Sequence, residues 1–227
     1  MQTIYENGDY LTNNTLWHEE DSAKKAEWII RMLKKHNINP SSICEIGCGA
    51  GAILLNISKK YPNARCLGTD ISPQAIEIAK KKENEKLKFI LGREDVIQKT
   101  SDVLLCIDVF EHIEDYFSFL REIKVKSEYK IFHIPLDMSA QAVSRKNRLL
   151  KNRKDVGHIH YFNKETALAV LVDCGYSIID FDYTNISETP GCKSPKYVNF
   201  LRNISFNLCP DLLVRVMGGY SLLVLTK

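Results

Sequence analysis

Acid and histidine side chains gather in two short stretches of the sequence. Asp108, Glu111 and His112 stand at positions i, i+3 and i+4, so they would share one side of a helix. His158 and His160 stand at alternate positions and would share one side of an extended segment. A neutral imidazole can take a proton from a hydroxyl near pH 7. The pattern predicts acid–base catalysis, with Glu111, His112, His158 and His160 as candidate catalytic groups.

Two other interpretations of the same residues stay open. Asp108, Glu111, His112 and one later histidine could hold a divalent metal that positions the oxygens of a substrate. The Glu111-His112 pair could also be structural, because an acid beside a histidine can cap a helix or order a pocket.

A glycine-rich run gives a second chemical signal. It reads Glu45-Ile46-Gly47-Cys48-Gly49-Ala50-Gly51 and lies between a strand-like and a helix-like segment. Glycines there let the backbone turn tightly and approach a ligand closely. The next strand-like segment ends at Asp70, 23 positions after Gly47, close to the spacing at which an acid meets a ribose. The run therefore predicts a site for a cofactor that contains a ribose.

A nicotinamide or flavin site is the competing interpretation of this run. The glycines follow the order G-x-G-x-G rather than G-x-G-x-x-G, and Glu45 stands two residues before the first glycine. The sequence also ends in a strand-like segment, an insertion and another strand-like segment. These features disfavour an NAD(P)-dependent oxidoreductase, which is kept as the alternative enzyme. A non-catalytic cofactor-binding module is the third hypothesis.

Strand-like and helix-like segments alternate from about Ile43 onward, which is typical of a parallel α/β sheet. The predicted strands are Ile43–Ile46, Arg65–Thr69, Leu87–Leu91, Val103–Ile107, Lys130–Ile134, Ser177–Tyr183 and Tyr220–Thr226. The predicted helices are Ser22–His36, Ala52–Lys60, Pro73–Lys82, Tyr116–Lys124 and Lys164–Cys174. In such a sheet, ligands bind at the carboxyl ends of the strands. The glycine run follows the first strand and Asp108 follows the fourth, so both would lie at that edge.

These motifs resemble those of the class I S-adenosylmethionine-dependent methyltransferase family. The resemblance is carried by Glu45–Gly51, Gly68–Ser72 and Cys106–His112. It implies an α/β fold with a Rossmann-like seven-stranded sheet, six strands parallel and the last antiparallel, flanked by helices. It also implies an N-terminal helix and an insertion before the last strand.

The resemblance implies that S-adenosyl-L-methionine is the cofactor and S-adenosyl-L-homocysteine the product. Glu45 would support the loop and the amino group of the cofactor, Asp70 would bind the ribose, and Ile71 would pack on the adenine. In the family, an acid that often follows a glycine after the third strand contacts the adenine amine. Here Arg93 follows Gly92 instead, and Glu94 and Asp95 come next. Asp95 is the preferred residue for that contact, with Glu94 as the alternative. The predicted cofactor-binding residues are Glu45, Gly47, Cys48, Gly49, Gly51, Asp70, Ile71, Glu94, Asp95 and Asp108. Some family members hold a metal at a similar site, with Glu where this chain has Asp108.

The methyl acceptor is expected to be a small or carbohydrate-like molecule that is methylated on oxygen. A basic cluster, Arg145 to Lys154, follows the fifth strand and contains six cations. It could recognise an anionic acceptor such as a phosphorylated sugar, or it could be a solvated surface. Few aromatic residues interleave with these cations, so nucleic acid is not the expected partner.

The 227 residues are 44% hydrophobic and carry a net charge of +3, which suits one α/β domain. We expect a single methyltransferase domain over 1–227, with a helical cap over 1–40 and substrate-side lids or insertions over 136–160 and 184–219. No run approaches the roughly 18 apolar residues of a membrane helix. Seven scattered cysteines and the lack of a signal-peptide pattern predict a cytoplasmic protein. The oligomeric state stays open.

Overall fold

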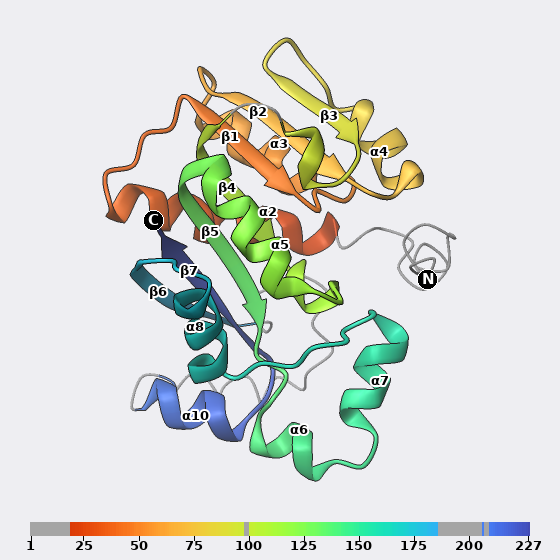
Figure 1. Cartoon of the computed structure of the whole chain (residues 1–227), viewed down its shortest axis with the longest axis vertical. Helices are drawn as coiled ribbons and strands as arrows, with labels where there is room; N and C mark the ends of the chain where they lie inside the picture. Colours follow the sequence, from red (N-terminus) through yellow and green to blue (C-terminus); the bar gives the residue numbers. More distant parts are fainter. Residues whose placement is uncertain (1–18, 98–99, 186–205, 207–208) are drawn as a thin grey trace.

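Seven apolar segments pair into one sheet with the strand order β3-β2-β1-β4-β5-β7-β6 (Figure 1). The computed structural model describes residues 19–97, 100–185, 206 and 209–227. The strands are β1 (Ser42–Ile46), β2 (Arg65–Asp70), β3 (Leu87–Leu91), β4 (Ser101–Ile107), β5 (Ser127–Pro135), β6 (Ile178–Asn185) and β7 (Tyr220–Thr226).

The strand directions match the predicted sheet. The pairs β1–β2, β2–β3, β1–β4 and β4–β5 are parallel. Strand β7 lies between β5 and β6 and runs antiparallel to both. Six strands therefore point one way and the last points the other way, as in the family that the motifs resemble.

Helices cover both faces of the sheet. They are α2 (Glu19–Lys35), α3 (Ala52–Lys60), α4 (Pro73–Lys80), α5 (Tyr116–Ile123), α6 (Ala140–Ser144), α7 (Arg148–Asp155), α8 (Lys164–Asp173) and α10 (Pro210–Val216). Their starts follow the sequence chemistry. Ser72 caps α4 and is followed by Pro73, while Asn163 and Thr166 form a capping box on α8, because these side chains satisfy amides that a helix leaves unpaired.

Alternate residues of the central strands divide the core into two halves. Val103 and Leu105 of β4 face the half that contains α2, α3 and α4. Leu104 and Cys106 face the half that contains α5, α8 and α10. This alternation follows from the two-residue period of a strand. The result is a sheet buried on both faces, whose carboxyl edge is left to carry the site.

Several predicted helix and strand ends differ from the structure by about one to three residues, and one segment has another conformation. Helix α4 ends at Lys80 rather than at Lys82, because Lys81 and Lys82 already belong to a turn. The segment from Asp108 to His112 is not one helix: Asp108 has a left-handed φ of 54°, and only Phe110–His112 forms a 3-10 turn. The predicted insertion over 184–219 contains α10, but its first two residues belong to β6, and 186–205 and 207–208 lie outside the described residues. No helix of the described ranges is both long and apolar enough to cross a membrane.

Candidate active site

The loop after β1 requires glycine for two reasons. Gly47, Gly49 and Gly51 have φ angles of 70°, 52° and 79°, in the region that side chains with a Cβ rarely adopt. A Cβ at Gly47 would lie 2.5 Å from Val109 Cγ2, and a Cβ at Gly51 would lie 2.5 Å from Phe89 Cζ. The loop can therefore turn sharply from β1 into α3 only with glycine at these positions.

Asp70, at the carboxyl end of β2, is held against this loop. Its Oδ2 accepts a hydrogen bond from the Gly49 amide, and its Oδ1 accepts one from the Ser72 amide, both at 2.8 Å. Burial raises the pKa of Asp70, although these amides oppose the rise. The carboxylate is thus fixed beside the glycine loop, where the sequence predicted the ribose, and Ile71 lies half-buried next to it.

Glu45 of β1 is a buried acid that lacks a partner. The residue is 1% exposed, and neither carboxylate oxygen has a hydrogen bond of normal geometry among the described residues. Burial first, and then the charge of Asp70, raises the pKa of Glu45 to about 8, against weaker opposing effects of Lys25 and the Leu54 amide. A buried carboxylate without a donor is unfavourable. It would be satisfied by a cationic ligand group such as the amino group of S-adenosylmethionine.

The other predicted cofactor residues border the same edge of the sheet. Glu94 and Asp95 lie on the 3-10 turn Glu94–Val96 after β3, where Glu94 is half-buried and Asp95 is exposed. Cys48 is buried within the loop, and its Sγ lies 2.9 Å from the place of a Cβ at Gly68. These residues therefore lie at the same edge of the sheet, and their contacts with the cofactor stay predictions.

Asp108 lies in a network of charges at the carboxyl end of β4. Its Oδ2 is 2.9 Å from Lys25 Nζ, and its Oδ1 accepts a hydrogen bond of 2.6 Å from His133 Nδ1. His133 Nε2 lies 2.8 Å from the Thr184 hydroxyl oxygen, and the imidazole stacks on Trp28. Burial opposes its charge, but His133 and Lys25 hold the pKa of Asp108 well below its ordinary value. The carboxylate is therefore a fixed anion that orients its neighbours.

Glu111, His112 and His158 form a cluster next to this network. One ligand atom of each lies within 4.8 Å of the others, and the rings of His112 and His158 meet edge to face with centroids 4.9 Å apart. Glu111 is 1% exposed, and its oxygens have no hydrogen bond among the described residues. Burial, together with the charge of Asp108, raises the pKa of Glu111. Burial and the neighbouring His158 lower the pKa of His112 to about 4, so His112 is neutral near pH 7.

The donor set of this cluster is suited to a transition metal. One carboxylate and two imidazoles are common ligands of zinc and of iron. The Nδ1 of His158 is already held by a carboxylate, which is usual for metal-bound histidines. The oxygens of Glu111, which have no hydrogen bond among the described residues, fit the same interpretation. Asp108, which the prediction included, is not part of the cluster, because it pairs with Lys25 and His133. The metal alternative stays open with Glu111, His112 and His158 as its ligands.

His158 is oriented by a residue that the sequence analysis missed. Its Nδ1–H donates to Asp137 Oδ2 at 2.5 Å, and Asn152 Nδ2 donates to Asp137 Oδ1 at 2.8 Å. This leaves Nε2 of His158 as the nitrogen that can take a proton. His160 is used differently: its Nε2–H donates to the Ile113 carbonyl at 2.9 Å, and it does not line the cavity described next.

A cavity of about 320 Å³ adjoins these groups. Its acid and histidine lining comes from α2, from the ends of β4 and β5, and from the segment after α7, and α6 and α7 close another side. The residues that carry charge or can exchange a proton are Asp21, Lys25, Asp108, His112, His133, Asp137, Arg148 and His158. Both the cavity and the glycine loop lie at the carboxyl ends of parallel strands, where α/β proteins bind their ligands.

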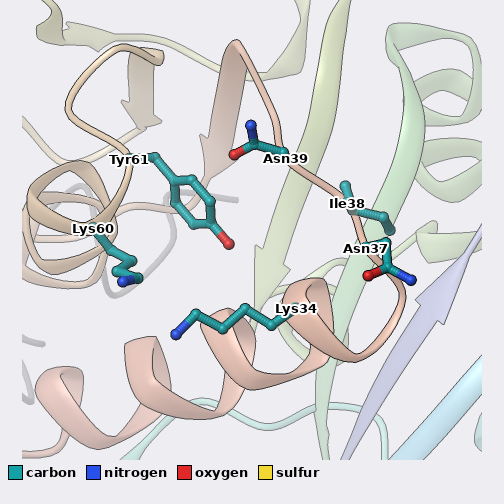
Figure 2. A pocket seen from close by; sticks show the side chains of 6 residues that line it. All are labelled: Lys34, Asn37, Ile38, Asn39, Lys60 and Tyr61. Carbon is teal, nitrogen blue, oxygen red and sulfur yellow. The ribbon is translucent and has the colours of Figure 1, made fainter.

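A second cavity, of about 440 Å³, lies away from these groups. Figure 2 shows Lys34 and Lys60 beside it, with the Tyr61 hydroxyl pointing into the space between them. Its lining, completed by Asn37, Ile38 and Asn39, contains no acid and no histidine. It is an open depression between the ends of α2 and α3, at the amino edge of the sheet.

The signals for the missed residues differ in strength. Asp137 follows β5 by two residues, so the rule that acids after parallel strands face the site could have found it. His133 lies inside β5 and reads as an ordinary strand residue. Lys25 lies on a helix more than 80 positions before Asp108, and nothing local in the sequence connects the two.

Comparison with known proteins places the chain among methyltransferases. Over 129 residues it is 30% identical to (S)-coclaurine N-methyltransferase of Thalictrum flavum subsp. glaucum, a match that covers 52% of this chain and 36% of the relative. Over 121 residues it is 31% identical to the mitochondrial ubiquinone biosynthesis O-methyltransferase of Schizosaccharomyces pombe, covering 49% of this chain and 43% of the relative. The chain thus matches less than half the length of these relatives.

Solved structures show the same fold. The magnesium protoporphyrin IX methyltransferase of Synechocystis PCC 6803 with bound S-adenosylhomocysteine is 16% identical, with a TM-score of 0.59 over 90% of this chain and 82% of that chain. The plantazolicin methyltransferase in complex with a monoazolic desmethylPZN analog and S-adenosylhomocysteine is 23% identical, with a TM-score of 0.59 over 97% of this chain and 88% of that chain.

The family model described as a methyltransferase domain matches residues 16–180. That range includes the glycine loop, Asp70 and the acid–histidine cluster. The match to a methyltransferase domain favours methyl transfer over the oxidoreductase alternative. The chain therefore belongs to this family of methyltransferase domains and is an S-adenosylmethionine-dependent methyltransferase.

Proposed function

We propose that this enzyme methylates a hydroxyl of a small, anionic or carbohydrate-like acceptor, with His158 as the general base. The observation that carries the proposal is the Asp137–His158 pair at 2.5 Å on the wall of the cavity. A carboxylate bound to Nδ1 fixes the imidazole tautomer that has a basic Nε2. The same arrangement activates hydroxyl groups in unrelated enzymes.

The cofactor, when bound, supplies a methyl group on a sulfonium and leaves as S-adenosylhomocysteine. The chain has to hold the acceptor hydroxyl in line and remove its proton. His158 Nε2 takes that proton as the new oxygen–carbon bond forms, and the carboxylate of Asp137 stabilises the resulting imidazolium. His112, which burial keeps neutral, adds no positive charge beside His158 as the proton arrives.

Arg148 supports an anionic acceptor. It lies on α7 at the wall of the cavity, and it has no acidic partner among the described residues, whereas Lys25 is neutralised by Asp21 and Asp108. A guanidinium can bind a carboxylate or a phosphate through two parallel hydrogen bonds.

Two other expectations stay proposals. The segments over 136–160 and 184–219 are proposed to belong to the acceptor side of the site. A cytoplasmic location is supported by the free thiols of Cys44 and Cys106.

Metal-assisted transfer is the second candidate, because the oxygens of the buried Glu111 accept no hydrogen bond from the described residues. Glu111, His112 and His158 would hold the ion, and the ion would bind the acceptor oxygen. The two candidates differ in a simple measurement. Dialysis against a chelator leaves the base mechanism fully active, whereas the metal mechanism loses activity and regains it with Zn²⁺, Mn²⁺ or Mg²⁺.

The proposed function is tested with hydroxylated acceptors in pairs, with and without a carboxylate or phosphate, while release of S-adenosylhomocysteine is followed. We expect turnover of an anionic acceptor, with a kcat that falls at least tenfold in His158→Gln (~1.4 kcal/mol) and a KM that rises in Arg148→Gln. His160→Gln is the matched control, because His160 lies outside the cavity lining. Equal kcat values for the parent and His158→Gln would refute the base, and methylation confined to amines would refute the oxygen acceptor.

A further inference from the structure

The helices α6, α7 and α10 form one end of the molecule (Figure 1). This end exposes apolar side chains. Helix α6 contacts both α7 and α10. Eleven large apolar side chains are exposed among the described residues, and five of them belong to this end. These five are Met138, Val143, Leu150, Leu212 and Val216. Val143 and Leu150 are 62% and 63% exposed.

The same end concentrates positive charge. Between Ala140 and Asp155 the chain has six cations and one acid, so this segment carries +5 while the whole chain carries +3. The remainder is therefore net negative. All six cations are exposed, and among the described residues their one acidic contact is Asp155, 3.9 Å from Lys151. We call residues 138–155 together with α10 the basic end.

We propose that the basic end binds the surface of an anionic lipid bilayer. A solvated surface would explain the cations but not Val143 and Leu150 beside them. A bilayer offers negative headgroups to the cations and an apolar layer a few ångströms deeper to the apolar side chains. Four of the five apolar side chains stand on three separate short helices, and Met138 precedes the first of these helices. That arrangement suits insertion between lipids better than the packed apolar centre of a protein interface.

The basic end also walls the acceptor cavity. Ala142 of α6, together with Arg148 and Asn152 of α7, lines the cavity on one side. A protein docked through these helices holds the cavity against the headgroups, so the fitting acceptor is amphipathic, with its reactive hydroxyl at the level of the headgroups. This statement about the acceptor rests on the proposed function. The binding of lipid does not, and it is measured without an acceptor.

The experiment is flotation of the whole protein with vesicles of phosphatidylcholine alone or mixed with phosphatidylglycerol. Each Lys or Arg at an anionic surface strengthens binding by about fivefold. We therefore expect binding to the mixed vesicles at least about tenfold tighter than to phosphatidylcholine, and weaker binding as salt is added. The variant Lys151→Gln/Arg153→Gln/Lys154→Gln should lose about 100-fold in affinity for the mixed vesicles. The variant Val143→Ser/Leu150→Ser should bind more weakly while keeping the salt dependence.

Matched controls change the same chemistry elsewhere. The variant Lys59→Gln/Lys60→Gln/Lys81→Gln removes equal charge from exposed positions, and Ile90→Ser/Val125→Ser removes exposed apolar side chains far from the basic end. Both should bind vesicles like the parent, and the affinity of each variant for S-adenosylhomocysteine reports its fold. Equal binding to both kinds of vesicle, or equal losses in the basic-end and control variants, would overturn the proposal. So would binding of polyglutamate without binding of vesicles, which would assign the basic end to an acidic protein.

Discussion

Binding of the cofactor should release a proton from Glu45. In the free protein, burial and the charge of Asp70 raise the pKa of Glu45 to about 8, and at pH 7 a group with that pKa is about 0.9 protonated. The amino group of S-adenosylmethionine or S-adenosylhomocysteine is expected beside this carboxylate, and a cation there favours the charged form. Binding at pH 7 should therefore release close to one proton.

The affinity should follow the same titration. Below pH 8 the carboxyl must be ionised before the ligand can pair with it, so Kd should rise about tenfold for each pH unit. At pH 6 the affinity for S-adenosylhomocysteine should be about 100-fold weaker than above pH 8, a difference of ~2.7 kcal/mol. Titration calorimetry in two buffers of different ionisation enthalpy measures both the affinity and the number of protons released.

The variant Glu45→Gln serves as the control, because it keeps the shape and removes the titration. Its affinity should be weaker than that of the parent at pH 8.5 and nearly constant between pH 6 and pH 8.5. A parent that releases no proton at pH 7 would contradict the assignment of the amino group to Glu45. A pH dependence that persists in Glu45→Gln would assign the proton to another acid, such as Asp70.

The stability of the ligand-free protein should depend on Glu45 in a related way. A carboxyl whose folded pKa lies above its unfolded value favours folding at low pH, and that contribution is lost as the pH rises. With an unfolded pKa near 4.5 and a folded pKa of about 8, the loss occurs between these values and amounts to ~5 kcal/mol at most. The melting temperature of Glu45→Gln should therefore exceed that of the parent at pH 8.5 and match it near pH 4.5.

Three further predictions concern separate parts of the site. Asp70→Asn should raise the Kd for S-adenosylhomocysteine at least tenfold (~1.4 kcal/mol), and an unchanged Kd in calorimetry would contradict the ribose assignment. Gly51→Ala should lower the free energy of unfolding by ~2 kcal/mol or more, because its Cβ would meet the Phe89 ring at 2.5 Å. Urea unfolding should show a smaller loss of unfolding free energy for Gly175→Ala. Its φ of 83° is similar to that of Gly51, but its Cβ would meet only the flexible end of Lys124. Asp137→Asn should lower kcat about tenfold or more with little change in KM; a rise in KM at constant kcat would show that Asp137 serves binding instead.

The sheet and the glycine loop could be predicted because their signals are local. Strand β3 and helix α3 begin and end where the apolar periodicity predicted, since a strand or a helix is specified by its own side chains. The glycines of the loop have the left-handed φ angles that their residue type suggests. The assignment of the cofactor residues depends on the same local pattern.

The acid–histidine site was less predictable because it is assembled from distant segments. The spacing of Asp108, Glu111 and His112 suggested one helix, but the chain turns at Asp108, whose φ of 54° is stabilised by contacts with Lys25 and His133. His158 and His160 stand two residues apart, yet only His158 lines the cavity. Such choices depend on tertiary contacts, which no window of the sequence contains.

The position of β7 has a consequence for how the chain folds during synthesis. This strand separates β5 from β6 in the sheet, although it follows both along the chain. While the ribosome is still making the residues before Tyr220, β5 has an open edge and β6 has no strand to pair with. The half of the sheet from β3 to β5 can assemble first, because each of its strands has a pairing partner within this half. Until the last strand arrives, the apolar edge of β5 is open to pairing with another nascent chain, which is the hazard of an unprotected strand.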